Sequence, residues 1–170
     1  MKIAWLKVIG SWRDVADAAR TTVRKEAGEG EPSSGWKRRM LLAEHSPIRK
    51  LKVAWKWKDI PWWVQGQLTR HKVGVEWYVS TSRSDRTGVD RTDLTHASLV
   101  DLEAEANAQA IINISRKRLC QRASKETREA WELFLIHLRN VEPELEECCV
   151  PECAYRGFCP EMEPCGFLGR

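Results

Sequence analysis

The sequence predicts an α+β fold, because its first half carries strand patterns and its second half carries helix patterns. Apolar residues alternate with lysines over residues 50–58, the period-two pattern of a strand with one buried and one solvated face. Residues 1–10 are typical of a first strand. Two long helices are expected at about residues 99–119 and 124–141, the second with a cap at its first residue.

Two shorter helices are expected in the N-terminal third. Ser11 is a suitable N-cap for an amphipathic helix that ends at the Gly/Glu/Pro run of residues 28–32. Ser33 or Ser34 can cap a second helix over residues 36–43. Each helix therefore has a local start signal.

The middle of the chain is expected to hold short elements. Ala54 occupies a solvent-phase position in the lysine-rich strand and is the exception to its alternation. Pro61 begins a helix that has His71 toward its end. A short strand is expected at residues 77–79, within a segment rich in Gly, Ser, Thr, Asp and Arg at residues 73–91.

The composition is that of an ordinary globular domain. With 170 residues, 42% of them apolar, the chain can bury one core, so a single domain at residues 1–147 and a tail at residues 148–170 are expected. No apolar run approaches the roughly 20 residues of a membrane span. The start is broken by two lysines and lacks a signal-peptide cleavage site. These features predict a cytoplasmic protein with no membrane partner.

Tryptophan is unusually frequent, with nine residues in the chain. Clustered indoles can stack on a flavin or a base. Burial is the usual fate of large aromatic side chains, so core packing is the expected role of most of them. Five lie close together in the sequence: Trp55, Trp57, Trp62, Trp63 and Trp77.

Three segments carry candidate binding residues. Residues 44–49 read E-H-S-P-I-R. Residues 67–72 read Q-L-T-R-H-K, followed by V-G-V-E-W-Y-V-S-T-S-R, which ends at Arg83. Residues 107–118 read N-A-Q-A-I-I-N-I-S-R-K-R. On one continuous helix, positions 107, 111, 114 and 118 share a face, so the first and last residues of this segment are expected to face one cleft.

In this order the segments resemble the motifs of the flavin-dependent thymidylate synthases. Residues 70–72 resemble the family's Arg-His-Arg triplet, with Lys in place of the second Arg. Residues 107–118 keep the spacing of the family's Asn-Ala-Arg, Asn and Arg positions, with Gln109 in place of the first Arg. Residues 46–47 match a Ser-Pro pair of the family. The resemblance covers about residues 44–128.

The resemblance implies a small, mostly antiparallel sheet with long helices packed on it, in a homotetramer that binds FAD and dUMP at subunit interfaces. The flavin, reduced by NADPH, would pass a one-carbon unit from methylenetetrahydrofolate to C5 of the uracil. A pyrimidine deoxynucleotide is therefore the expected partner, and a flavoprotein methyltransferase of nucleotide biosynthesis is the expected class.

The resemblance also implies roles by position. Arg118 would be catalytic and would stabilise the ionised uracil. The residues that line FAD would be Ser46, Arg70, His71, Lys72, Val73, Asn107, Gln109 and Asn113. The residues that hold the nucleotide, with Arg83 as its phosphate clamp, would be Gln67, Arg70, Ser80, Thr81, Ser82, Arg83 and Arg118.

The middle of the chain departs from the family and leaves the substrate open. Only 23 residues separate Arg83 from Asn107, where family members carry a much longer helical insertion. Another pyrimidine nucleotide such as dCMP, a hydroxymethylated product, or a non-catalytic homologue that binds nucleotide or nucleic acid would explain the same loss. A basic run at residues 116–118 could meet phosphates, but such a face is usually solvated, which argues against a nucleic-acid partner.

The cysteine-rich tail is a second departure. Four thiols in a Pro/Gly-rich segment without a core of its own suit a zinc or iron–sulfur site, because a reducing cytosol disfavours disulfides. Buried or free thiols are an equally open interpretation. The candidate ligands are Cys149, Cys153, Cys159 and Cys165, with Cys120 able to replace one of them.

Overall fold

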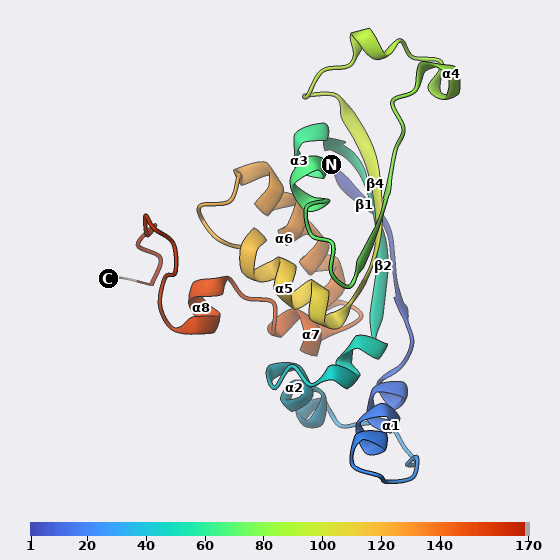
Figure 1. Ribbon diagram of the computed structural model, residues 1–170, viewed down its shortest axis with the longest axis vertical. Helices are drawn as coiled ribbons and strands as arrows, with labels where there is room; N and C mark the ends of the chain where they lie inside the picture. Colours follow the sequence, from blue (N-terminus) through green and yellow to red (C-terminus); the bar gives the residue numbers. More distant parts are fainter. Residues whose placement is uncertain (169–170) are drawn as a thin grey trace.

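A computed structural model gives the structure of residues 1–168, so the last two residues of the predicted tail lie outside the described part. Four antiparallel strands form one sheet in the order β1-β2-β4-β3 (Figure 1). The strands are β1 (Lys2–Ile9), β2 (Lys52–Pro61), β3 (Val75–Val79) and β4 (Leu99–Asn107). The predicted strands at residues 1–10, 50–58 and 77–79 are confirmed.

Helices cover one side of this sheet, with α5 and α6 at the centre of the helical layer (Figure 1). This arrangement confirms the predicted α+β fold. The helices are α1 (Trp12–Thr22), α2 (Ser34–Leu42), α3 (Trp62–Leu68), α4 (Ser84–Thr87), α5 (Ala108–Arg118), α6 (Lys125–Arg139), α7 (Pro143–Glu147) and α8 (Glu152–Arg156), with short 3-10 turns η1 (Ser46–Lys50) and η2 (Arg91–Asp93).

The core lies between the sheet and α6. Trp55 and Trp57 of β2 project into it and meet Trp131 and Phe134 of α6, all four fully buried. The rings of Trp55 and Phe134 lie 4.2 Å apart, centroid to centroid. These tryptophans therefore serve as core, whereas Trp63 is 38% exposed.

The opposite face of the sheet is polar. Lys52 pairs with Glu105 at 2.8 Å across β2 and β4, and Lys56 pairs with Asp101 at 3.2 Å. The lysine phase of β2 thus points to solvent, as its alternation predicts. Ala54 is the exception here too, since only 5% of it is exposed.

The N-terminal helices begin where their capping residues predict. The Ser11 hydroxyl accepts a hydrogen bond from the Asp14 backbone N–H, and the Asp14 carboxylate accepts one from the Ser11 N–H, which completes a capping box. Ser33 caps α2 through the Trp36 N–H. Ser124 is the N-cap residue of α6, but its hydroxyl does not accept the expected hydrogen bond from the backbone. It donates to the Thr127 hydroxyl instead.

The predicted helix over residues 99–119 is wrong in its first half. Residues 99–107 form β4, and the helix begins only at Ala108. Ala and Glu favour a helix by propensity, but Leu102, Ala104 and Ala106 alternate with acids and are buried against the helical layer. Pairing with β2 and β3 on both sides outweighs the local preference.

Asn107 therefore does not lie on a helix face shared with Arg118. It is the N-cap of α5, and its side-chain oxygen accepts a hydrogen bond from the Ala110 N–H at 2.9 Å. Its own backbone N–H donates to the Gly74 carbonyl at 2.9 Å. Ile111 and Ile114, the positions between them on the expected face, are core residues.

Gly74 is held where a side chain cannot fit. Its φ is +74°, and a Cβ there would lie 2.6 Å from the Asn107 side-chain nitrogen. Gly74→Ala should destabilise the fold by about 1–3 kcal/mol, because it adds left-handed backbone strain and displaces the N-cap of α5. Urea denaturation measures this loss.

Gly66→Ala is the matched control for this substitution. Gly66 lies inside α3, and a Cβ there meets nothing within 4 Å. Alanine at that position should leave stability unchanged or raise it by about 0.5–1 kcal/mol. Equal effects at Gly66 and Gly74 would contradict the role given to the Gly74–Asn107 contact.

Within residues 1–168, no helix is long and apolar enough to cross a membrane.

Candidate functional site

Three predicted site residues meet at the C-terminal end of α5. The Arg118 guanidinium donates from Nε to His71 Nε2 at 2.9 Å. It also donates to the Gln67 backbone carbonyl at 2.8 Å and lies 3.5 Å from the Gln67 side-chain oxygen. Gln67 is near the end of α3, so the turn after α3 is held against the last turn of α5. The structure thus brings together residues that are 51 positions apart in the sequence.

This end of α5 carries positive charge without a nearby acid. Burial lowers the pKa of Arg118, and the charge of Arg70 lowers it further. In the described part of the chain, neither Arg70 nor Arg118 has a carboxylate within ion-pair distance, although twelve other ion pairs are present. Two guanidinium groups in this arrangement favour an anionic ligand, such as a phosphate or an ionised base.

His71 is neutral in this arrangement. Burial lowers its pKa to about 4, with a smaller contribution from the positive charge of Arg118. A neutral imidazole can accept the Arg118 hydrogen bond through Nε2, whereas a protonated one cannot. The Trp77 indole N–H donates to the His71 carbonyl at 2.7 Å and fixes the backbone beside the ring.

The lowered pKa makes the stability of the fold pH-dependent. Because the folded state resists the proton that the unfolded chain accepts near pH 6.5, the contribution of His71 is complete above about pH 6.5 and is lost as the pH falls through about 4. His71→Gln should therefore lose less stability than the wild type between about pH 7 and about pH 4. Urea midpoints across this range test the prediction, with exposed His96→Gln as the control. Parallel curves for wild type and His71→Gln would refute it.

A second group of residues lies along the middle of α5. Gln109 donates to the Glu44 carboxylate at 2.5 Å, and Arg116 pairs with the same carboxylate. Burial alone would raise the pKa of Glu44, but the hydrogen bonds from Arg116 and Gln109 outweigh it and lower the pKa. The Arg116 guanidinium also lies 3.5 Å from the ring centroid of Tyr155 in α8. Asn113, which accepts from Arg116 at 3.2 Å, is exposed beside this group.

These contacts direct the side chains of the basic run at residues 116–118 to different partners. Arg116 is turned to Glu44, Arg118 is turned to Gln67 and His71, and of the three only Lys117 is exposed. The run therefore does not present the continuous basic face that a nucleic-acid backbone would need.

The remaining predicted flavin residues are spread out. Lys72 and Val73 are exposed in the turn between α3 and β3, directly after His71 in the sequence. Ser46 is exposed at the start of η1, in a shallow hollow with Pro47 and Lys50. Among residues 1–168, no hydrogen bond joins Ser46 to the Gln67–His71–Arg118 group, and the hollow that Ser46 lines includes none of these three residues.

The predicted nucleotide segment lies beyond the end of β3. The Ser80 hydroxyl donates to the Asp101 carbonyl at 2.6 Å. Thr81 and Ser82 line a hollow of about 750 Å³, part of it open to solvent, which Trp62 of α3 also lines. Arg83 pairs with Asp85 at 2.7 Å in the outlying loop that carries α4 (Figure 1). Among residues 1–168 of one chain, no hydrogen bond or ion pair joins Arg83 to Arg118.

Comparisons with known proteins then bear on the fold. No family model matches the chain, and no curated protein matches it. Among solved structures, the flavin-dependent thymidylate synthase ThyX from Helicobacter pylori, in complex with FAD and dUMP, is 12% identical and superposes with a TM-score of 0.69. The match covers 88% of this chain and 100% of that chain. The chain has the fold of the flavin-dependent thymidylate synthases.

A second neighbour with this fold is the UMP/dUMP methylase PolB from Streptomyces cacaoi, bound to 5-Br dUMP. It is 14% identical, has a TM-score of 0.63, and matches over 92% of this chain and 94% of its own. At such identities the likeness concerns the fold. It confirms the architecture that the sequence resemblance to flavin-dependent thymidylate synthases implies.

Three residues around the site are not among the site residues that the sequence predicts. Glu44 organises Gln109 and Arg116, Trp77 holds the His71 backbone, and Tyr155 stacks on Arg116. Glu44 lies in the first motif segment and Trp77 in the second, so their positions were a signal. Tyr155 comes from the tail, and no sequence pattern links it to α5.

The tail is where this chain differs from the flavin-dependent thymidylate synthase motifs most plainly. Cys149 is buried and its thiol donates to the Leu145 carbonyl at 3.3 Å, so it does not join the other predicted ligands. The other four candidate ligands (Cys120, Cys153, Cys159 and Cys165) line one hollow. Within residues 1–168, no three His, Cys, Asp or Glu side chains are close enough together to hold a single metal ion.

Proposed function

We propose that this protein is a flavin-dependent methyltransferase that transfers a one-carbon unit from methylenetetrahydrofolate to C5 of dUMP, with NADPH as reductant. The observation that carries the proposal is the meeting of Gln67, His71 and Arg118 at one end of α5, beside Arg70 and without an acid partner. The fold is shared with a protein solved with FAD and dUMP, which supports the proposal.

The base of the nucleotide fits the end of α5. Arg118 is half-buried and held by two neutral acceptors, so its charge is not neutralised by the protein. A guanidinium held in this way can stabilise negative charge that develops on a uracil ring during reaction. Neutral His71 and the Gln67 carbonyl hold it in place and add no competing charge. We assign Arg118 as the catalytic residue, with His71 and Gln67 as positioning residues.

The residues present also fit a flavin. Arg70 and Lys72 are exposed cations in the turn after α3, and a diphosphate favours such positions. Asn113 and Gln109 offer amide groups along α5 that can bond a flat polar ring. When bound, the reduced flavin would carry the one-carbon unit to the pyrimidine. The chain's own residues would orient the two rings against each other.

The nucleotide phosphate requires residues that one chain holds apart. Ser80, Thr81, Ser82 and Arg83 lie beyond β3, away from Arg118. In the homotetramer that the family resemblance implies, this segment of one subunit would reach the α5 end of another. Arg83 would then exchange its exposed partner Asp85 for the phosphate.

The test is to purify the protein, add FAD, and follow flavin reduction by NADPH and product formation from dUMP and methylenetetrahydrofolate by mass spectrometry. Binding of FAD, reduction by NADPH and formation of dTMP are expected. A protein that binds neither FAD nor dUMP after reconstitution would refute the proposal. Product from dCMP or UMP, or a hydroxymethylated product, would refute only the assignment of dUMP methylation.

A further inference from the structure

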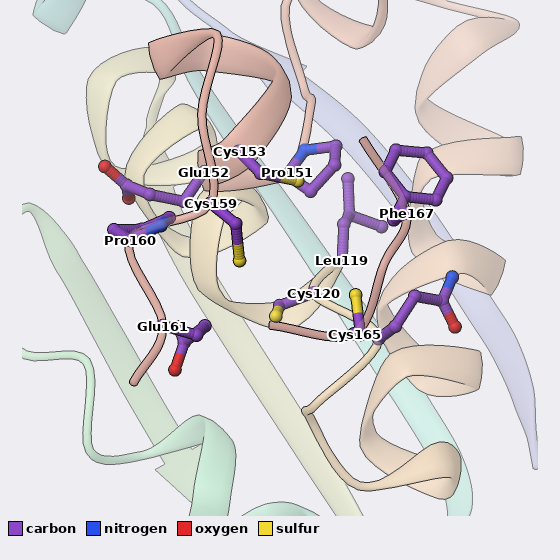
Figure 2. A pocket seen from close by; sticks show the side chains of 11 residues that line it. Leu119, Cys120, Pro151, Glu152, Cys153, Cys159, Pro160, Glu161, Cys165 and Phe167 are labelled. Atoms are coloured by element: carbon purple, nitrogen blue, oxygen red, sulfur yellow. The ribbon is translucent and has the colours of Figure 1, made fainter. Parts of the chain in front are cut away.

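Four cysteines from two distant parts of the chain surround one hollow. Cys120 follows the C-terminal end of α5, Cys153 lies in α8, and Cys159 and Cys165 follow in the tail. The hollow holds about 340 Å³ of empty space, part of it open to solvent. Figure 2 shows the sulfur atoms of Cys120, Cys159 and Cys165 turned toward the same space. Leu119, Pro151 and Phe167 supply an apolar wall.

The other two cysteines have different surroundings. Cys149 is buried, its thiol donates to a backbone carbonyl, and burial raises its pKa to about 12. Burial raises the pKa of Cys148 to about 11, with a further contribution from the nearby Glu147 carboxylate. Both favour the protonated thiol, which is a poor metal ligand. Neither lines the hollow.

The segment after α8 has little to hold it in place. Its apolar side chains Phe158, Met162 and Phe167 are exposed, so it has no core of its own. One ion pair, between Arg122 and Glu163, ties it to the turn after α5. An exposed ion pair of this kind contributes at most about 1 kcal/mol, which is too little to order the segment. A metal centre would supply the missing stabilisation.

The sulfur of Cys120 is held by the backbone of the turn that follows α5. It accepts a hydrogen bond from the Arg122 backbone N–H at 3.4 Å. Such a bond can orient a sulfur ligand toward a metal. The side chains of Arg122 and Lys117 beside this turn are paired with Glu163 and Glu152.

The arrangement favours a cluster over a single zinc ion. Zinc binds each sulfur at about 2.3 Å, which requires four sulfurs in close mutual contact. The thiols here are spread around the hollow, and no three ligand side chains in residues 1–168 stand at single-ion distance. An iron–sulfur cluster holds its thiolates farther apart, because several irons lie between them. Five residues separate Cys153 from Cys159, and five separate Cys159 from Cys165, wider than the pairs typical of zinc fingers.

We propose that Cys120, Cys153, Cys159 and Cys165 bind a four-iron, four-sulfur cluster that fastens the tail to the end of α5. This cluster is additional to the proposed nucleotide chemistry. Its first ligand, Cys120, comes two residues after Arg118 in the sequence. Loading from a preformed cluster is a ligand exchange. Four cysteine thiols replace four small thiolate ligands, each passing its proton to the thiolate that leaves, and no electron is transferred.

The test begins with the full chain, purified without oxygen from iron-supplied cells. Iron, zinc and acid-labile sulfide are measured, because bound flavin contributes neither metal nor sulfide. About four irons and about four sulfides per chain are expected. If the protein is isolated without iron, it is incubated with a preassembled four-iron cluster carrying small thiolate ligands, and the same ratio is expected after desalting. Zinc in place of iron, or no metal after this incubation, would overturn the proposal.

Cysteine variants identify the ligands. Cys159→Ser and Cys120→Ser should each lose most of the iron, whereas Cys149→Ser should keep it, since serine can still donate to the Leu145 carbonyl. Cys165→Ser is the variant expected to disturb the fold least, because the Cys165 side chain is exposed. Circular dichroism checks each fold. Iron lost from Cys149→Ser and kept in Cys120→Ser would overturn the ligand set.

The result is independent of the proposed enzyme activity. FAD is released by acid and quantified separately, so a protein with the cluster and no flavin supports this inference while refuting the proposed function. Trypsin gives a second readout, because exposed Arg156 lies between two ligands. Cleavage there should slow at least about tenfold in the cluster-loaded protein, and equal cleavage of loaded and cluster-free protein would contradict the fastening role.

Discussion

Arg118→Ala is expected to lower turnover of dUMP by about 100-fold to 1,000-fold, the usual loss when a preorganised donor to developing charge is removed. The guanidinium is held by His71 and the Gln67 carbonyl and has no acid partner in residues 1–168. Steady-state formation of product, measured with FAD bound, gives kcat and KM separately. The loss should fall mainly on kcat, because the charge that Arg118 stabilises forms during reaction.

Two further variants sharpen this result. Arg118→Lys keeps the charge and loses the forked donors, so it should recover only a small part of the activity. Lys117→Ala is the control, since this neighbouring cation is exposed and makes only a 3.8 Å contact with Glu152. Activity of Arg118→Ala close to that of the wild type would remove Arg118 from the proposed chemistry.

Trp131→Ala should destabilise the fold by about 3–5 kcal/mol, the loss typical of a fully buried aromatic side chain. Its ring lies 4.8 Å from Phe134 and 6.1 Å from Trp55, centroid to centroid, at the contact of α6 with the sheet. Its indole N–H donates to the Ser115 hydroxyl at 2.8 Å, so truncation also leaves a buried hydroxyl with one partner fewer. Urea denaturation followed by circular dichroism measures the change.

Trp5→Ala is the control for this substitution. Trp5 lies on the polar face of the sheet and is 37% exposed, so its loss should cost about 1 kcal/mol or less. A similar cost for both tryptophans would show that the layer between α6 and the sheet is not the dominant core.

The sequence predicted correctly those strands and helices that are specified by residues close together in the chain. The lysine alternation of β2 and the Ser11 cap of α1 depend on neighbouring residues, and both are present. The strand β4 was missed because its Ala/Glu composition favours a helix in isolation. Its strand conformation depends on β2 and β3 on either side, which sequence periodicity does not report.

The site was predictable only in part for a similar reason. Family spacing led to Gln67, His71 and Arg118, which the fold brings together. The periodicity of an assumed continuous helix grouped Asn107 with Arg118 on one face, whereas Asn107 ends a strand and caps the helix. Among the cysteines, spacing could not show that Cys149 turns into the core while Cys120 joins the tail. That outcome depends on how α7 and α8 pack against α5.

Both ends of α5 are fastened to one stretch of chain that runs from the last turn of α3 to the start of β3. At its start, the Asn107 N–H bonds the Gly74 carbonyl, and at its last residue Arg118 bonds Gln67 and His71. One residue inserted between these anchors would turn the guanidinium by about 100° and advance it by about 1.5 Å. The number of residues in this helix is therefore as constrained as their identity. Natural variants of this chain should therefore keep the length of α5 even where they exchange its exposed Lys117.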